Sequence, residues 1–276
     1  MTHTYTRRYT GPLKAVVLDW AGTTVDFGCL APAAAFMEAF HRSGVDITLE
    51  QARAPMGMPK WNHIQAITRM PPVAEAWTAK HGKAPTDADV DALYERFLPL
   101  QVGVVAEHSA LIPGALDAVE AMRARGLKIG STTGYPAPVM EVVLAEAAKQ
   151  GYRPDCVVCA GETPAGRPGP YMALKCLIDL QISPVQACVK IGDTVVDVEE
   201  GLNAGMWTIA LTDTGNEVGL PLAEWREVPE TGRAALRARA ADKLAGAGAH
   251  YVVPSLADAL PLLDVIEARL ARGETP

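Results

Sequence analysis

The sequence predicts an α/β fold, with a Rossmann-like parallel sheet core and an inserted all-helical cap subdomain. Two observations support this prediction. Short apolar runs rich in β-branched residues alternate with segments of helical spacing along most of the chain. This alternation stops between about residues 27 and 107, where the spacing is helical and no convincing strand occurs. We therefore expect an α/β core of residues 1–26 and 108–276 and a helical cap of residues 27–107.

Length and composition exclude several classes of protein. The chain has 276 residues, 49% of them hydrophobic and 21% charged, which is typical of one large globular domain or of a domain with an insertion. Its net charge of −7 argues against nucleic acid or an anionic membrane surface as a partner. No apolar run is long enough to span a membrane or to form a signal peptide. We expect a cytoplasmic protein whose first 14 residues are a short mobile lead-in.

The five cysteines predict no redox or zinc site. Cys156 and Cys159 form a CxxC pair, but they fall in a segment with the pattern of a strand, whereas a redox CxxC opens a helix. A zinc site would need a second such pair. We expect all five to be buried, reduced thiols.

The first strand, Ala15–Leu18, leads directly into a carboxylate. Asp19 follows this apolar run and begins a turn that contains glycine. Ligands of open α/β sheets bind beyond the carboxyl ends of the strands, so Asp19 is a candidate site residue. For a single aspartate, capping of the turn would be the simpler explanation.

The cap is predicted to consist of short helices interrupted by proline and glycine. Pro32 suits a first helical turn, Gly44 suits a helix end, and Thr86 and Asp89 have the spacing of a capping box. The predicted helices are residues 32–43, 49–54, 60–69, 73–80 and 86–107.

After residue 107 the α/β alternation returns. The predicted strands are residues 127–131, 156–158, 187–191, 207–211 and 251–253. The predicted helices are residues 113–125, 136–150, 171–180 and 195–204, with a last one ending near 272. Residues 217–247 are charged and rich in alanine, and we expect them to form helices outside the sheet. Strands separated by helices of this length imply right-handed βαβ units and a parallel sheet.

Polar groups follow four of the strands, and in a parallel sheet all four strand ends lie at one edge. They are Asp19, the pair Thr132 and Thr133, Arg167 in the loop after the third strand, and Asp193 with Asp197 one helical turn later. Carboxylates gathered there would repel each other unless a cation lay among them, and oxygen ligands beside a phosphoryl group suit Mg²⁺. The hydroxyls and the N–H groups of a helix starting at Tyr135 suit an anion, and Arg167 adds positive charge. Taken singly, each residue could instead be a turn cap or a surface charge.

This set resembles the haloacid dehalogenase superfamily. The matching motifs are DWAGT at residues 19–23, STTG at residues 131–134, Arg167, and GDTVVD at residues 192–197. The resemblance implies that Asp19 is a nucleophile that forms an aspartyl-phosphate. It implies that Mg²⁺ is held by Asp19, the backbone carbonyl of Ala21 and Asp193, with Asp197 orienting the metal shell. The insertion resembles the helical cap that closes over such sites.

One departure from that superfamily points to a particular leaving group. Its phosphatases carry a second aspartate, a general acid, at the position of Ala21. Without that acid, a carbon leaving group stabilised as an enamine would fit, and this requires an aldehyde and a lysine. The cap segment PMGMPKWNH, residues 55–63, supplies Lys60. If Lys60 opens a helix, His63 shares its face and could carry protons to and from the amine. A solvated surface lysine is the alternative.

The motifs DWAGTTVDFGC, PMGMPK and STTGY together resemble the phosphonoacetaldehyde hydrolases within that superfamily. The resemblance implies hydrolysis of the P–C bond of phosphonoacetaldehyde to acetaldehyde and phosphate, through a Schiff base on Lys60, in the degradation of 2-aminoethylphosphonate. It also implies substrate contacts from Met56, His63 and Tyr135, and phosphate contacts from Thr133 and Arg167. Met56 and Tyr135 could equally be packing residues. Cys29 lies near the cap hinge, and we assign it no role.

Several alternatives follow from the same residues. A capped phosphatase or phosphomutase acting on a small phosphate ester is the nearest, although Ala21 and Lys60 argue against it. A non-catalytic binding protein with the same fold is a second. The resemblance also suggests a homodimer formed through cap helices. Apolar faces near Phe36 and Phe40 could serve in it, or could pack only within the cap. Lys60 must be neutral to attack an aldehyde; burial would lower its pKa, and a nearby phosphonate would raise it.

Overall fold

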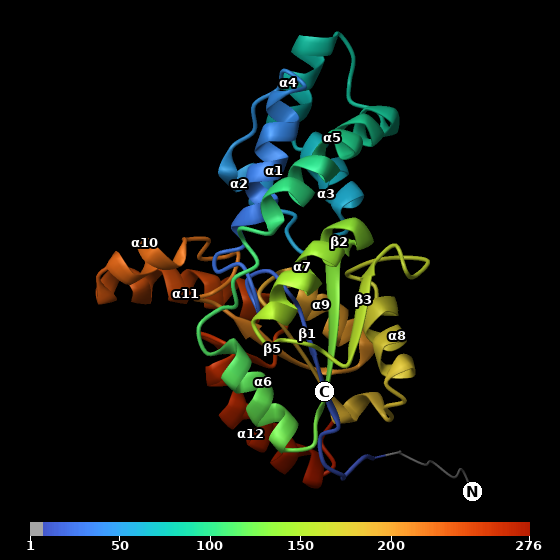
Figure 1. Ribbon diagram of the computed structural model, residues 1–276, viewed down its shortest axis with the longest axis vertical. Coiled ribbons are helices and arrows are strands. Elements are labelled where there is room, and N and C mark those ends of the chain that lie inside the picture. The colour runs from blue at the N-terminus through green and yellow to red at the C-terminus, as the bar shows by residue number, and fades with distance from the viewer. Residues whose placement is uncertain (1–7) are drawn as a thin grey trace, which may run out of the picture.

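The computed structural model describes residues 8–276 and confirms the predicted α/β class. Residues 1–7, the first half of the predicted lead-in, lie outside the described part. Six strands form one parallel sheet in the order β3-β2-β1-β4-β5-β6, so the first strand of the chain lies near its centre (Figure 1). The strands are β1 (Ala15–Leu18), β2 (Lys128–Pro136), β3 (Cys156–Ala160), β4 (Cys188–Gly192), β5 (Trp207–Leu211) and β6 (Tyr251–Val253).

Helices cover both faces of the sheet. On one face lie α6 (Ala115–Ala124), α7 (Ala137–Lys149) and α12 (Leu260–Ala271). On the other lie α8 (Tyr171–Asp179), α9 (Val195–Ala204) and α11 (Glu230–Gly246), with the short α10 (Leu222–Glu227) projecting beside α11 (Figure 1). Side chains of β1 alternate between these layers: Val16 belongs to the cluster with α6 and α12, and Val17 to the cluster with α8. Because both faces are covered, the strand is apolar throughout.

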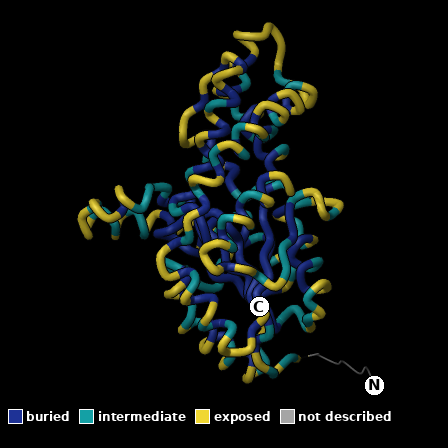
Figure 2. Tube along the Cα trace, in the orientation of Figure 1, coloured by how far each residue is buried: buried dark blue, intermediate teal, exposed yellow. Residues whose placement is uncertain are grey.

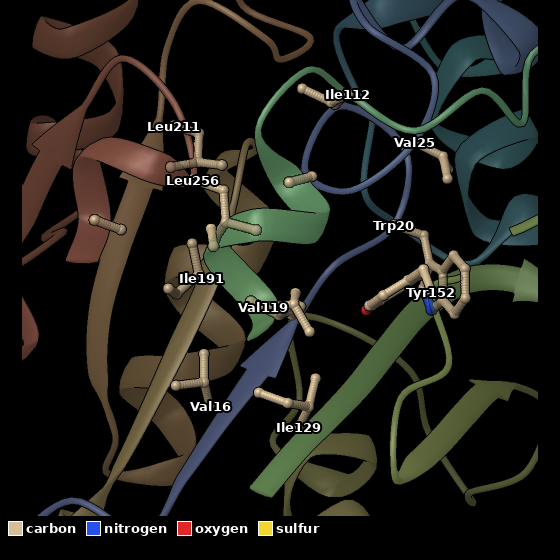
Figure 3. Packing of buried hydrophobic residues seen from close by; sticks show 14 of the residues in the cluster. Val16, Trp20, Val25, Ile112, Val119, Ile129, Tyr152, Ile191, Leu211 and Leu256 are labelled. Carbon is tan, nitrogen blue, oxygen red and sulfur yellow. The ribbon is translucent and has the colours of Figure 1, made fainter. Parts of the chain in front are cut away.

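Packing of the core fixes the direction of the chain just after β1. The Trp20 ring meets the Tyr152 ring edge to face, with centroids 5.1 Å apart, and its Nε1–H donates to Ser131 Oγ at 3.0 Å (Figure 3). Trp20 is fully buried. Since Trp20 follows Asp19 directly, this packing anchors the chain next to the Asp19 carboxylate.

Five helices between β1 and α6 form a second body above the sheet (Figure 1). They are α1 (Leu30–His41), α2 (Leu49–Arg53), α3 (Lys60–Thr68), α4 (Pro71–His81) and α5 (Asp87–Val105). They bury a hydrophobic cluster of their own, whose buried members all lie between Ala35 and Phe97, and dark-blue segments run through both bodies in Figure 2. Phe36 stacks on Phe97 with ring centroids 4.3 Å apart. This separate cluster supports the predicted cap, whose bounds at residues 27 and 107 stay a prediction.

The cap cluster also bears on the proposed dimer faces. Phe36 and Phe40 are fully buried inside the cap. They therefore pack within the cap and do not form an exposed dimer face. The predicted capping box at α5 is confirmed, since Asp89 Oδ2 accepts hydrogen bonds from Thr86 N and Oγ1 at 2.8 and 2.6 Å.

The largest difference from the sequence prediction concerns the second strand. We expected the second strand to end at Ser131 and a helix to start near Tyr135, but β2 continues to Pro136 and α7 begins at Ala137. The reason is pairing with β3: after an irregularity beyond Thr132, the ladder resumes between Pro136 and Ala160. No helix therefore starts at Tyr135. The free N–H groups of a first helical turn, which we predicted there as an anion site, are absent at that residue.

Two smaller predictions concern cysteines and membranes. All five cysteines are free, and Cys156 and Cys159 lie in β3, as their pattern indicated. Four of them are buried as predicted, but Cys156 is only half-buried. Within residues 8–276, no helix combines the length and the hydropathy needed to cross a membrane.

Candidate active site

Asp19 lies at the carboxyl end of β1, held by the strand and by the turn that follows it. Its N–H donates to Ile191 O of β4 at 2.9 Å. The N–H groups of Thr23, Thr24 and Val25 all converge on Trp20 O, at 2.8–3.1 Å, and this closes the turn. Asp19 as a whole is 6% exposed. Burial, with the nearby Asp197, raises the pKa of Asp19 to about 6, against the opposing charges of Arg167 and Lys190.

Asp193 and Asp197 come from the loop after β4 and from the first turn of α9, and they bring their carboxylates to Asp19. Oxygen atoms of all three lie within 4.8 Å of one another, and all three side chains are buried. Asp197 Oδ1 is paired with Arg167 Nη1 at 3.0 Å and with Lys190 Nζ at 2.9 Å. Asp193 has no ion-pair partner within residues 8–276, and it accepts from Asn216 N at 2.7 Å.

The charges around these carboxylates do not balance. Asp19, Asp193, Asp197 and Glu200 are buried acids, while the buried cations that pair with them are Arg167 and Lys190. When all four acids are ionised, four negative charges face two positive ones. Burial and the neighbouring Asp19 and Asp197 raise the pKa of Asp193 well above its usual range. A bound divalent cation would remove both the imbalance and this shift.

The backbone near Ala21 offers a further oxygen to such a cation. Among the hydrogen bonds of residues 8–276, none ends on the Ala21 carbonyl. With the carboxylates of Asp19 and Asp193, this gives an all-oxygen donor set of the kind that hard divalent cations prefer. The residues present therefore fit a divalent metal.

Arg167 is the centre of the buried ion network. Its Nη1 lies 2.7 Å from Asp19 Oδ1, and its Nε lies 2.8 Å from Glu200 Oε2. Its Nη2 donates to the carbonyl and the hydroxyl of Thr132, both at 2.6 Å. The Thr132 hydroxyl also donates to Glu200 Oε2 at 2.9 Å and accepts from Lys190 at 3.1 Å.

These bonds correct one prediction of the sequence analysis. The Thr132 side chain is fully engaged below the sheet edge and does not line the cavity beside Asp19, so it positions Arg167 instead of offering a phosphate contact. Its neighbour Thr133 does line that cavity, because successive side chains of a strand point to opposite sides. The Thr133 hydroxyl accepts from Tyr135 N at 3.1 Å.

Lys60 brings an amine from the cap to the same cavity. It is the first residue of α3 and is only 4% exposed. Its Nζ lies 5.0 Å from the centre of the Tyr135 ring and 5.5 Å from that of the Phe36 ring. Burial lowers the pKa of Lys60 to about 8, although Cys29 and Asp19 oppose the shift. The alternative of a solvated surface lysine is excluded.

The cavity between cap and core is small. It measures about 20 Å³, which is room for about one water molecule. A phosphonate does not fit in this volume, so binding of such a substrate requires the cap and the core to rearrange. Besides Asp19 and Lys60, its lining includes Ala21, Cys29, Met56, Thr133, Tyr135, Arg167 and Asp193.

His63 lies one turn along α3; it is fully buried and is not among the residues that line this cavity. Its Nε2 is 2.8 Å from Ala52 O, and its ring centre is 3.9 Å from that of Phe36. A carbonyl only accepts hydrogen bonds, so the proton is on Nε2 and the lone pair is on Nδ1. Nδ1 is buried and has no hydrogen-bond partner among the described residues. Burial and the charge of Lys60 hold the pKa of His63 well below its usual range, so the ring is neutral.

Sequence reasoning missed the lower half of the ion network, Lys190 and Glu200. Lys190 interrupts an otherwise apolar strand, β4, and a lysine there is a signal of a buried, paired charge. Glu200 lies one turn beyond Asp197 on α9, but the sequence alone does not show whether Glu200 or its neighbour Glu199 joins the buried ion network. Only the rotation of the helix against the sheet distinguishes them, placing Glu200 at 0% exposure.

Comparisons with known proteins agree with this geometry. The family model of haloacid dehalogenase-like hydrolases matches residues 13–205. The chain is 49% identical to the phosphonoacetaldehyde hydrolase of Nitratidesulfovibrio vulgaris over 271 residues, which cover 98% of this chain and 97% of that protein. It is 50% identical to the phosphonoacetaldehyde hydrolase of Klebsiella pneumoniae over 266 residues, with 96% and 99% covered. The chain belongs to the phosphonoacetaldehyde hydrolase family.

A solved structure extends the agreement to three dimensions. A phosphonoacetaldehyde hydrolase-like protein from Oleispira antarctica superposes over 100% of both chains with a TM-score of 0.97, at 41% identity. Membership of the phosphonoacetaldehyde hydrolase family thus covers the cap as well as the core. Both Lys60 and Asp19 lie in the span that the wider family model matches.

Proposed function

We propose that this protein hydrolyses the P–C bond of phosphonoacetaldehyde to acetaldehyde and phosphate, in the degradation of 2-aminoethylphosphonate. One observation carries the proposal: the Lys60 amine from the cap and the Asp19 carboxylate from the core line the same small cavity. An amine that forms an iminium with the aldehyde and a nucleophile that attacks phosphorus are the two groups that this route of P–C cleavage uses. The names of the relatives at about half identity support the same substrate.

The first step is formation of an imine on Lys60. The neutral amine adds to the aldehyde carbon, and water leaves to give an iminium. The pKa of about 8 makes the neutral amine far more abundant near neutral pH than for an ordinary lysine. His63 shares a helix face with Lys60, but the lowered pKa of its ring disfavours a proton on Nδ1, so His63 could carry protons in this step only if substrate binding raised that pKa.

The second step transfers phosphorus to Asp19. The carboxylate attacks phosphorus, the P–C bond breaks, and its electron pair forms the C=C bond of an enamine on Lys60. The iminium nitrogen takes up the charge, so no acid is needed at the leaving carbon, and this agrees with Ala21 at that position. Arg167 lies 2.7 Å from Asp19, where it offsets the repulsion between carboxylate and phosphonate.

Water completes the reaction. The enamine takes a proton on carbon, and hydrolysis of the resulting imine releases acetaldehyde and regenerates Lys60. A second water hydrolyses the aspartyl-phosphate to phosphate and Asp19. Imine formation released one water, so the sum consumes one water per substrate.

We propose Mg²⁺ as the metal of the buried carboxylate cluster. Asp19, Asp193 and the Ala21 carbonyl would hold it, and Asp197, fixed by Arg167 and Lys190, would orient its shell. When bound, Mg²⁺ supplies positive charge that offsets the negative charge of the phosphonate and of Asp19.

Borohydride trapping tests the proposal. The protein is incubated with phosphonoacetaldehyde and borohydride, and adducts are mapped by mass spectrometry. We expect one reduced adduct on Lys60, absent in Lys60→Arg and retained in Lys149→Arg, a control at an exposed lysine. No adduct, or an adduct on another lysine, would contradict the imine mechanism and favour a capped phosphatase or phosphomutase acting on a small phosphate ester.

Oligomeric state and location are further proposals. We propose a homodimer through the cap helices, because α1 exposes Met37 and the start of α2 exposes Leu49, at 37% and 48%. Light scattering on the eluting protein measures this, and a monomeric mass at micromolar concentration would reject it. We propose a cytoplasmic location, since five unpaired cysteines suit a reducing compartment.

A further inference from the structure

Arg53, at the end of α2, ties the cap to two segments outside it. Its Nη1 donates to Gly28 O at 2.9 Å, where the chain passes from the core into the cap. The same nitrogen donates to Asn216 O at 3.2 Å, and Nη2 donates to Gly219 O at 2.9 Å. Asn216 and Gly219 belong to the segment after β5. One guanidinium thus joins three segments far apart in the sequence.

These contacts are not those of an ordinary surface arginine. Arg53 is half-buried, and within residues 8–276 it forms no ion pair. Its acceptors are backbone carbonyls and the Asn216 side-chain oxygen at 3.4 Å. Gly219 has φ of +67°, and a Cβ there would collide with the guanidinium, so the segment is shaped to receive Arg53. In return, Asn216 Nδ2 donates to Arg53 O at 3.4 Å.

The segment that Arg53 holds also orients Asp193. Asn216 N donates to Asp193 Oδ2 at 2.7 Å, whereas the hydrogen bond from Thr23 to Asp193 Oδ1 is longer, at 3.4 Å. Among the described residues, no cation pairs with Asp193. The Asn216 N–H is therefore the shortest contact that fixes the direction of the Asp193 carboxylate. A chain of direct contacts therefore runs from the cap, through Arg53 and Asn216, to Asp193.

We propose that Arg53 is a positioning residue that couples closure of the cap to the orientation of Asp193. When the cap closes, the guanidinium reaches the carbonyls of residues 216 and 219 and orders the segment that carries the Asn216 N–H. When the cap opens, these bonds break and Asp193 loses its fixed direction. The metal site is then complete only in the closed form. The inference rests on the proposed function only through the proposed Mg²⁺ site.

The test compares Arg53→Ala and Arg53→Lys with Arg42→Ala, a control at an exposed cap arginine whose ion pair is with Glu38 on its own helix. Mg²⁺ binding is measured by calorimetry without substrate, and hydrogen exchange of residues 212–220 is measured by mass spectrometry. We expect Arg53→Ala to weaken Mg²⁺ binding by about tenfold, the lower end for loss of a group that orients a metal ligand. Exchange in residues 212–220 should become faster, and Arg42→Ala should match the wild type.

Rescue distinguishes positioning from general stability. A cavity of about 690 Å³ lies beside Arg53, so free guanidinium ion has access to the vacated place in Arg53→Ala. At concentrations too low to unfold the protein, it should restore Mg²⁺ affinity. Arg53→Lys keeps the aliphatic chain, and its affinity should fall between those of the wild type and Arg53→Ala.

Two outcomes would overturn the inference. One is Mg²⁺ affinity within twofold of the wild type together with unchanged exchange in residues 212–220. The other is a lowered melting temperature in both Arg53 variants without any change in Mg²⁺ affinity, which would show a purely structural role. If borohydride traps no adduct while Mg²⁺ affinity depends on Arg53, the proposed function fails and this inference stands.

Discussion

The amine of Lys60 lies 5.0 Å from the centre of the Tyr135 ring, so a cap helix and a core strand meet at the reacting amine. Tyr135 belongs to β2, which extends to Pro136, and Lys60 is the first residue of α3. Tyr135 and Phe36 shield the amine from water from two sides, one in each body. Closure of the cap therefore sets the protonation of Lys60 as well as its position.

The pH dependence of the reaction should show both active groups. Asp19 must be ionised; its pKa is about 6 without a metal, and a bound divalent cation lowers it. Lys60 must be neutral, and its pKa is about 8. Since the pKa of Lys60 is lowered, its reactive form is gained as pH rises. We expect kcat/KM to rise about tenfold per pH unit between these two values and to level off above the higher one. Steady-state assays of acetaldehyde release would check this, and a flat profile around neutral pH would contradict it.

Removing Lys190 should affect both stability and the acidic limb of that profile. Lys190→Met leaves Asp197 and Glu200 with Arg167 as their only buried partner cation in the described structure. Breaking such a buried network costs about 3–5 kcal/mol of unfolding free energy. Lys190 also lowers the pKa of Asp19, so its loss should move the acidic limb to higher pH.

Urea unfolding and the pH profile together measure these two effects. Lys128→Met, at an exposed position at the start of β2, is the matched control and should change neither. If Lys190→Met lowered the unfolding free energy by less than about 1 kcal/mol, the size expected of a surface ion pair, the buried charges would not depend on Lys190 for their stability.

Mg²⁺ should stabilise the folded protein by relieving the surplus of negative charge. At about 100 times its dissociation constant, an ion that binds only the native state adds about 2.7 kcal/mol. Asp193→Asn should abolish this gain and should make the metal-free protein more stable, because it removes a buried negative charge without an ion-pair partner. Thermal unfolding in EDTA and in MgCl₂ measures both effects, with KCl of equal ionic strength as control. A wild type that is indifferent to Mg²⁺ would contradict the charge count.

Ala21→Asp should exchange one chemistry for another. The new carboxyl would point into the cavity beside Asp19, where a general acid for an oxygen leaving group belongs. We expect turnover of p-nitrophenyl phosphate to rise by about 10²-fold, the lower range for general acid catalysis. P–C cleavage should fall, because a further carboxylate repels the phosphonate. Phosphate release from both substrates would be compared, and an unchanged ratio would mean that Ala21 does not select the leaving group.

Local patterns in the sequence predicted most of the core and the chemical groups of the site. Strands β5 and β6 and helix α9 have the predicted bounds, because their apolar runs are short and end at clear turn signals. Asp19 and Asp193 could be placed together because strand ends of a parallel sheet share an edge.

Features that depend on contacts distant in sequence could not be predicted. Arg53 and Asn216 are 163 positions apart, and nothing local links them. The extension of β2 is decided by pairing with β3 and not by the residues of β2 themselves. The side of the strand to which Thr132 points depends on this register, so the sequence could not separate Thr132 from Thr133.

The separate burial of the cap cluster has a consequence for when the enzyme can react. Because the cap is held together by its own apolar cluster, it can swing as one piece without exposing that cluster. The amine travels with one body and the nucleophile stays with the other. In an open molecule the Lys60 amine and the Asp19 carboxylate are apart, so the reaction cannot proceed. The P–C bond becomes labile only when the substrate contacts both groups.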